Sequence, residues 1–287
     1  MKRFALMSLI LFATASLSAQ FCSPTNIIAA AASAQGGGGT NWKTDVAIYN
    51  PNAAAATAYL YLVKAGVANP SPQEVRVPIG AHSTITLVDV VKEKFGFTGS
   101  GALAVLSMSL TDYITTGVEG PNFLVTSRTY NDQGAAGTYG QTINGTVFPN
   151  VYKASVTGIA NNSRYRTNVG VVNLMGLYGF VTNTMVKAKV YNASGGLVHT
   201  LDFDMQPLSQ LQQGLGATVD DGYVVFEAQG LYAEATMFVA YASRVDQLTG
   251  DAVYIPAAFN PGDYDDSGTE DNCDVICPTA AGRGWGR

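Results

Sequence analysis

The residues best suited to chemistry lie in an acidic segment near the C-terminus. This segment alternates carboxylates with other oxygen-bearing groups and reads Asp263-Tyr264-Asp265-Asp266-Ser267-Gly268-Thr269-Glu270-Asp271-Asn272-Cys273-Asp274. Proteins bind calcium through about six to eight oxygen atoms, so this composition predicts a calcium site. The alternative is a solvated acidic tail.

The spacing of this segment resembles a single EF-hand-like calcium loop, in which a glycine follows the fifth position. The resemblance implies the ligands Asp263, Asp265, Ser267, the Thr269 carbonyl, Asp271 and Asp274. The last position is Asp instead of the usual Glu, and no amphipathic helix flanks the segment. With its cysteines, the segment is also similar to one thrombospondin type 3 repeat, in which cysteines staple calcium loops.

The chain has three cysteines, which in an exported protein predict one disulfide and one cysteine left over. Cys273 and Cys277 are nearest in sequence and are the predicted pair. A bond from Cys22 to either of them, or to another molecule, stays open.

Two arginines and two amide or acid residues recur along the chain. Arg128 and Arg244 recur in one pair of similar stretches, and Asp45 and Asn168 recur in another. An anion site is one interpretation. We predict instead a structural role, because a half-buried guanidinium must find acceptors such as backbone carbonyls or Asp45.

The sequence contains few residues arranged in patterns that are typical of catalytic sites. The two histidines are His82, in a turn, and His199, in an alternating strand-like stretch. No Gly-x-Ser-x-Gly elbow or His-Glu-x-x-His motif occurs. We therefore predict a protein that is not an enzyme.

The first residues have the order of a secretory signal. Lys2 and Arg3 precede an apolar stretch, and residues 1–19 end in Leu17-Ser18-Ala19. No later stretch approaches the roughly 20 apolar residues that span a bilayer. We expect a secreted or cell-surface protein, with the periplasm as an alternative, and no transmembrane segment.

The charge is low and uneven. Charged residues make up 13% of the chain, and most of the net charge of −5 falls after residue 262. The rest is nearly neutral and has no basic stripe, which argues against nucleic acid as a partner.

An internal repeat organises the sequence. Three phrases recur in the same order, namely 42–50 with 165–173, 101–105 with 222–226, and 125–128 with 241–244. Within each copy apolar residues alternate with polar ones, and turn residues are dense. The sequence predicts an all-β fold with two tandem immunoglobulin-like antiparallel β-sandwich domains, 20–146 and 147–258, and an irregular acidic tail, 259–287.

These phrases, together with Gly137-Thr138-Tyr139-Gly140-Gln141, resemble a group of uncharacterised two-copy exported bacterial β-sandwich proteins. The likeness covers about residues 24–258. The resemblance implies the fold and export of the protein. It implies no activity for any particular residue.

These observations favour a non-enzymatic structural or adhesive protein, with polysaccharide or other surface proteins as partners and its oligomeric state open. One alternative is a carbohydrate-binding protein that uses exposed tyrosines, such as Tyr59 with Tyr61 on a wet sheet face. A secreted hydrolase is the other alternative, and it lacks a recognisable site.

We expect millimolar calcium to protect the acidic segment from proteolysis, because a cation offsets the repulsion between converging carboxylates. Asp265→Ala should abolish the protection by removing a ligand, whereas Asp266→Ala should retain it. Limited proteolysis in calcium and in chelator measures this. Equal loss from both substitutions, or no heat of calcium binding, would contradict the predicted site.

Overall fold

The computed structural model describes residues 22–259 apart from 37, 38, 117–119, 148, 181 and 232. The predicted signal peptide, calcium ligands and Cys273–Cys277 pair lie outside these residues. We call residues 22–146 the first half and residues 147–259 the second half. Neither described α-helix is long and apolar enough to cross a membrane.

The predicted all-β fold is confirmed, since most of the described residues lie in antiparallel strands and the helices are short. The first half contains β1 (Thr25–Gln35), β2 (Asn41–Asn50), β3 (Ala56–Lys64), β4 (Glu74–Ile79), β5 (Ser83–Leu87), α1 (Val90–Phe95), β6 (Gly99–Leu106), α2 (Leu110–Thr116), β7 (Leu124–Asp132), η2 (Gly134–Ala136) and β8 (Thr138–Asn144).

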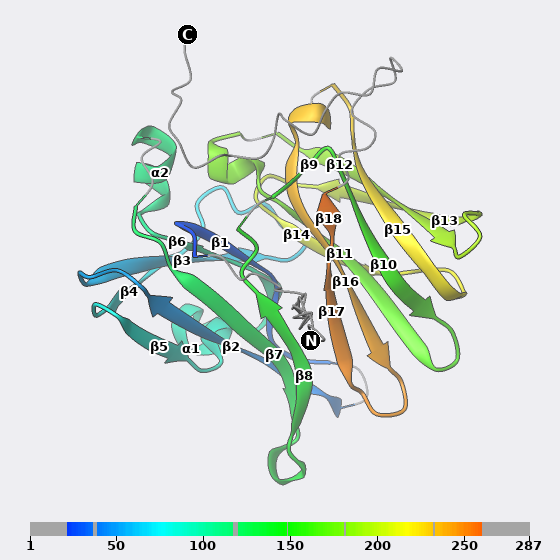
Figure 1. Ribbon diagram of the computed structural model, residues 1–287, viewed down its shortest axis with the longest axis horizontal. Helices are drawn as coiled ribbons and strands as arrows, with labels where there is room; N and C mark the ends of the chain where they lie inside the picture. The colour runs from blue at the N-terminus through cyan, green and yellow to red at the C-terminus, as the bar shows by residue number, and fades with distance from the viewer. Residues whose placement is uncertain are drawn as a thin grey trace, which may run out of the picture.

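The second half is built in the same way. It contains β9 (Asn150–Val151), β10 (Lys153–Asn161), β11 (Tyr165–Asn173), η3 (Met175–Tyr178), β12 (Thr184–Asn192), β13 (Leu197–Met205), β14 (Gln210–Gly214), β15 (Val219–Gln229), η4 (Ala233–Ala235), β16 (Met237–Asp246), β17 (Ala252–Pro256) and β18 (Ala258–Phe259). Figure 1 shows the two halves beside one another, with β8 of the first running next to β17 of the second.

Both halves have the same strand order. In the first half the orders are β4-β3-β6-β1 and β5-β2-β7-β8, which the end of β1 joins into one 8-stranded sheet. In the second half the orders are β13-β12-β15-β10, with β18 added beside β10, and β14-β11-β16-β17, with β9 added beside β16. In immunoglobulin constant domains the first two strands are neighbours in one sheet. Here β1 pairs chiefly with β6 and meets β2 only at its end. The likeness to immunoglobulins is therefore one of architecture, and the connectivity differs.

The recurring glycines of the repeat have a steric reason. Gly101 lies opposite Lys64, and Gly222 lies opposite Asn192, at the same place in the two halves. A Cβ on Gly101 would lie 2.2 Å from the Val63 carbonyl oxygen, and one on Gly222 equally close to that of Tyr191. Only glycine permits this approach of the two strands.

The asparagines that end β2 and β11 also have matching roles. Asn50 Oδ1 accepts from the backbone of Asn52, and its amide donates to the Gly80 carbonyl. Asn173 Oδ1 accepts from the backbone of Met175, and its amide donates to the Gln206 carbonyl. Each buried side chain satisfies turn groups that would otherwise be unpaired.

Three hydrophobic cores hold the molecule together. One lies between the two sheets of each half. A third joins the halves and contains Ile27, Ala29, Tyr61, Val63, Ala102, Ala104, Leu106, Val172, Leu174, Leu177, Leu208, Val239 and Tyr241. Strands β3, β6 and β1 are therefore buried on both faces, whereas Arg76 and Pro78 of β4 are exposed. That the halves are separately folding domains stays a prediction.

The predicted wet face with Tyr59 and Tyr61 is wrong. Tyr61 is 2% exposed and belongs to the third core. Its hydroxyl donates to Glu74 and accepts from the Leu110 backbone. Burial, with the bond to Glu74, raises the pKa of Tyr61. The ring of Tyr59 carries the Arg76 guanidinium, 5.4 Å from its centroid. This pair offers no open platform.

We expect Leu106→Ala to lower the free energy of unfolding by about 2–5 kcal/mol, because Leu106 is fully buried in the third core. Leu103→Ala is the matched control, since Leu103 lies on the same strand but faces the core of the first half. Hydrogen exchange should speed up in β11 and β16 with Leu106→Ala only. Unchanged exchange there would contradict a core shared by the halves.

Candidate functional site

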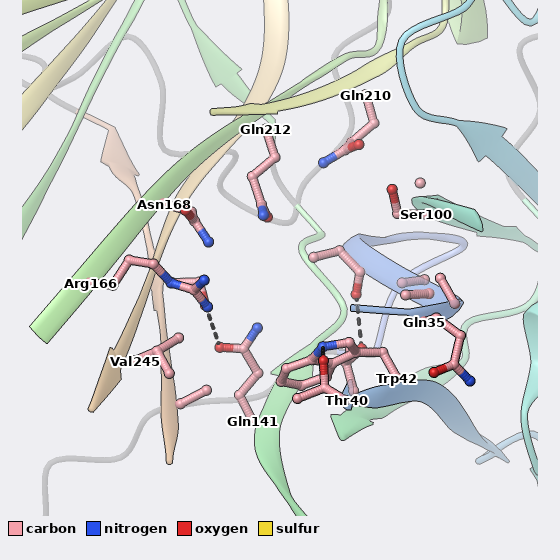
Figure 2. A pocket seen from close by; sticks show the side chains of 18 residues that line it. Gln35, Thr40, Trp42, Ser100, Gln141, Arg166, Asn168, Gln210, Gln212 and Val245 are labelled. Carbon is pink, nitrogen blue, oxygen red and sulfur yellow. Dashed lines mark hydrogen bonds between the residues drawn. The ribbon is translucent and has the colours of Figure 1, made fainter. Parts of the chain in front are cut away.

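The candidate site is a cleft of about 360 Å³ between the two halves, which we call the inter-half cleft (Figure 2). Ligand pockets usually have volumes of about 300–1,000 Å³. Its walls come from β1, β2, β6, β7 and β8 on one side and from β11, β14, β16 and β17 on the other. Neither half alone forms it.

The first-half wall contains small side chains and one indole beside polar side chains such as Gln35 and Gln141. Ala30, Ala31, Ala32 and Ala34 of β1 line the cleft where this strand leaves one sheet for the other. Trp42 lines it from β2, and its Nε1 donates to Thr40 Oγ1 at 3.1 Å. Because this bond occupies the indole donor, Trp42 offers the cleft an apolar surface.

The second-half wall is rich in amides because β14 alternates its faces. Gln210 and Gln212 face the cleft, whereas Leu211 packs into the core of the second half. The Tyr241 hydroxyl lies between the two glutamines. It accepts from Gln210 Nε2 at 2.8 Å and donates to Gln212 Oε1 at 2.9 Å.

This buried hydroxyl fixes the orientation of both amides. Tyr241 is fully buried, and burial raises its pKa, so it stays a neutral donor and acceptor. Its two bonds leave Gln210 Oε1 as a free acceptor and the Gln212 amide as a free donor. The wall therefore shows one acceptor and one donor in fixed positions.

Hydrogen bonds across the boundary hold the two walls together. Ser243 Oγ donates to Gln141 Oε1 at 3.0 Å. At another edge, the backbone of Gly66 donates to the Gln210 carbonyl at 2.8 Å, and Asn69 Nδ2 donates to the Leu208 carbonyl at 2.9 Å. These bonds and the third core set the shape of the cleft before any ligand enters.

Arg166 is the one charged residue in the lining, and Asn168 follows it on the same face of β11. The Arg166 side chain has no hydrogen bond or ion pair among the described residues. Figure 2 shows Arg166, Asn168, Gln141 and Gln212 pointing toward one space. These four polar tips come from two strands of the second half, β11 and β14, and from β8 of the first half.

Of the four residues predicted to be structural, only Asn168 lines the cleft. Asp45 accepts from the Asp89 backbone at 2.9 Å and from the Tyr130 hydroxyl at 3.3 Å. Arg128 lies opposite Asp45 in the sheet, yet its guanidinium donates to Thr138 Oγ1 at 2.9 Å. The sequence predicted backbone carbonyls or Asp45 as acceptors for the arginines, and Arg128 also donates to a backbone carbonyl, that of Thr138, at 3.4 Å.

Arg128 and Arg244 do not occupy equivalent positions, which corrects the sequence alignment. Arg128 lies opposite Asp45, but Ser243 lies opposite Asn168, so Arg244 is one residue out of step. Arg244 donates to the Gly158 carbonyl at 2.7 Å and covers the Tyr165 ring. The structure therefore brings the four residues into no common site.

The predicted calcium ligands and the Cys273–Cys277 pair cannot be placed, because they lie outside the described residues. Within the described part, no group of three or more His, Cys, Asp or Glu residues could hold a metal ion. Cys22 is exposed and has no disulfide partner there. A second cavity, of about 400 Å³, lies beside Cys22 and is also lined by Tyr113 and Leu174.

Sequence reasoning missed Gln141, Arg166, Gln210 and Gln212 as site residues. Trp42 and Arg166 served only as markers of the repeat. A signal was present in β14, where glutamines alternate with Leu211 on a short strand. Such alternation predicts that the glutamines form one face of the strand. A polar face of this kind is normally expected to lie in solvent, whereas here it lines the cleft.

Comparison with known proteins gives no name to this cleft. No family model matches the chain, and no curated protein matches it. Its chemistry must be judged from its own residues. Amides, hydroxyls and an indole suit a ligand with many hydroxyl groups, since amides can donate and accept at once.

We expect Tyr241→Phe to lower the free energy of unfolding by about 1–3 kcal/mol, because it leaves the buried Gln210 amide without its acceptor. Urea unfolding measures the change. Tyr165→Phe is the control, since the Tyr165 hydroxyl has no hydrogen bond among the described residues. Equal stability of both variants would contradict the bracing role of Tyr241.

Proposed function

We propose that the protein is a non-enzymatic, exported adhesive protein that attaches to a saccharide through the inter-half cleft. The observation that carries this proposal is the lining itself. Trp42 contributes an apolar ring face, and Gln141, Asn168, Gln210 and Gln212 contribute amides from both halves. The N-terminal sequence supports export to where polysaccharides are found.

A saccharide suits this lining for chemical reasons. Sugar hydroxyls both donate and accept, so they match amides that have one free donor or acceptor each. The carbon-hydrogen face of a sugar ring is apolar and can lie on an indole. The alanines of β1, of which Ala34 lies opposite Trp42 in the sheet, add small apolar side chains to this lining.

The rigid frame also favours binding. Because hydrogen bonds and a shared core hold the walls in place, little ordering is needed when a ligand enters. This replaces the exposed tyrosine platform as the carbohydrate site. Tyr191 and Tyr223 form another tyrosine pair, and their ring planes are only 10° apart. Because each ring covers one face of the other, that face is not open to a sugar ring.

We expect the protein to bind members of an array of extracellular polysaccharides and oligosaccharides. Gln212→Ala should weaken the binding by about threefold to tenfold, the value of one neutral hydrogen bond. Gln213→Ala is the matched control, because Gln213 lies next to it but donates to the Asp202 carbonyl away from the cleft. Calorimetry with the best array member measures both.

Two results would contradict the proposal. One is a protein that binds no member of the array. The other is binding that Gln213→Ala weakens as much as Gln212→Ala, since that would place the ligand elsewhere or show that both changes act through folding.

A further inference from the structure

We propose that the saccharide held by the inter-half cleft carries a carboxylate group, as in a uronic acid, and that Arg166 binds it. This inference rests on the proposed saccharide function. The charge of the cleft and the hydrogen-bond donors in it indicate this class of ligand.

The charge of the cleft is opposite to that of the chain. Arg166 is the only charged side chain among the described lining residues, and none of them is acidic. The protein as a whole carries a net charge of −5. A cationic group in this setting is an attractive partner for an anionic ligand.

Donors outnumber acceptors where the polar tips meet. Gln141 Oε1 is occupied by Ser243, and Gln212 Oε1 is occupied by Tyr241. Both amide nitrogens are therefore left to donate into the cleft. With the guanidinium of Arg166 they form a donor-rich space, which Figure 2 shows between Arg166, Asn168 and Gln212. An acceptor-rich group such as a carboxylate fits it.

The residue of the first half that corresponds to Arg166 is a base in an ion pair. Lys43 is the equivalent of Arg166, and it forms an ion pair with Asp132 at 2.7 Å. The position equivalent to Asp132 is Gln247, whose amide donates to the Asn162 carbonyl. The second half thus keeps the base and lacks its acid, which leaves the guanidinium available to a ligand.

Arginine suits a carboxylate better than lysine does. Its planar guanidinium can give two parallel hydrogen bonds to the two oxygens, and such charge-assisted bonds are about twice as strong as neutral ones. The geometry also predicts that a substituted carboxylate, as in a methyl ester, loses the contact while the rest of the sugar stays the same.

The test compares oligogalacturonate with its fully methyl-esterified form by calorimetry on the full chain. We expect the acid to bind tighter, and Arg166→Gln to weaken acid binding by about 10-fold to 100-fold while leaving the ester unchanged. Arg164→Gln is the matched control, since Arg164 lies two residues away and pairs with Asp246. Arg166→Lys should retain part of the preference.

The outcomes separate the two proposals. Equal binding of acid and ester, or acid binding that Arg166→Gln does not weaken, overturns the carboxylate and leaves the saccharide site standing. Tighter binding of dextran sulfate than of oligogalacturonate, lost in Arg166→Gln, overturns a carboxylate in favour of a sulfate. No binding of these probes or of any array member overturns both proposals. Thermal unfolding of each variant excludes loss of fold as the cause.

Discussion

Strands β3, β6 and β1 form a sheet that is buried on both faces, and the rest of the structure depends on this constraint. One face packs against β5-β2-β7-β8, and the other packs against the second half through the third core. A doubly buried sheet needs apolar residues on both sides, which explains the continuous buried run from Gly101 to Leu106. Because this sheet packs within the first half on one face and against the second half on the other, the relative position of the halves is fixed. The shape of the cleft at the margin of the sheet is fixed with it.

Much of the fold could be predicted from the sequence because the repeat and the period of two report local geometry. The alternation that places Val46 and Ile48 inside is a property of any half-buried strand. The recurring residues turned out to hold the fold. Gly101 permits close strands, Asn50 satisfies a turn, and Thr44 accepts from the Ala32 backbone while bonding to Thr129. Repetition within the chain therefore marked architecture.

The cleft could not be predicted in the same way, because its lining comes from strands far apart in the chain. Trp42 and Gln212 line the same cleft only because the two halves pack together through the third core, and this packing involves whole sheets. Alternation in β3 suggested a wet face for Tyr61, since period-two logic cannot distinguish solvent from a second protein layer. The continuous apolar stretches in β6 and in β16, from Phe238 to Ala242, were the available sign of burial on both faces.

Duplication gives a physical reason for a site at this boundary. The two copies have one strand order, but their equivalent faces meet different surroundings. The outer face of β5-β2-β7-β8 carries the Lys43–Asp132 pair, whereas the outer face of β14-β11-β16-β17 packs on the first half. On that second face, the centre must become apolar, as at Val172, and only its margin can keep polar groups. Arg166 lies on this margin, beyond the reach of the core and opposite Gln141 of the other copy. The interface between the two halves therefore has a rigid apolar centre and polar residues around it. The cleft forms at the part of this polar edge where the two halves do not touch.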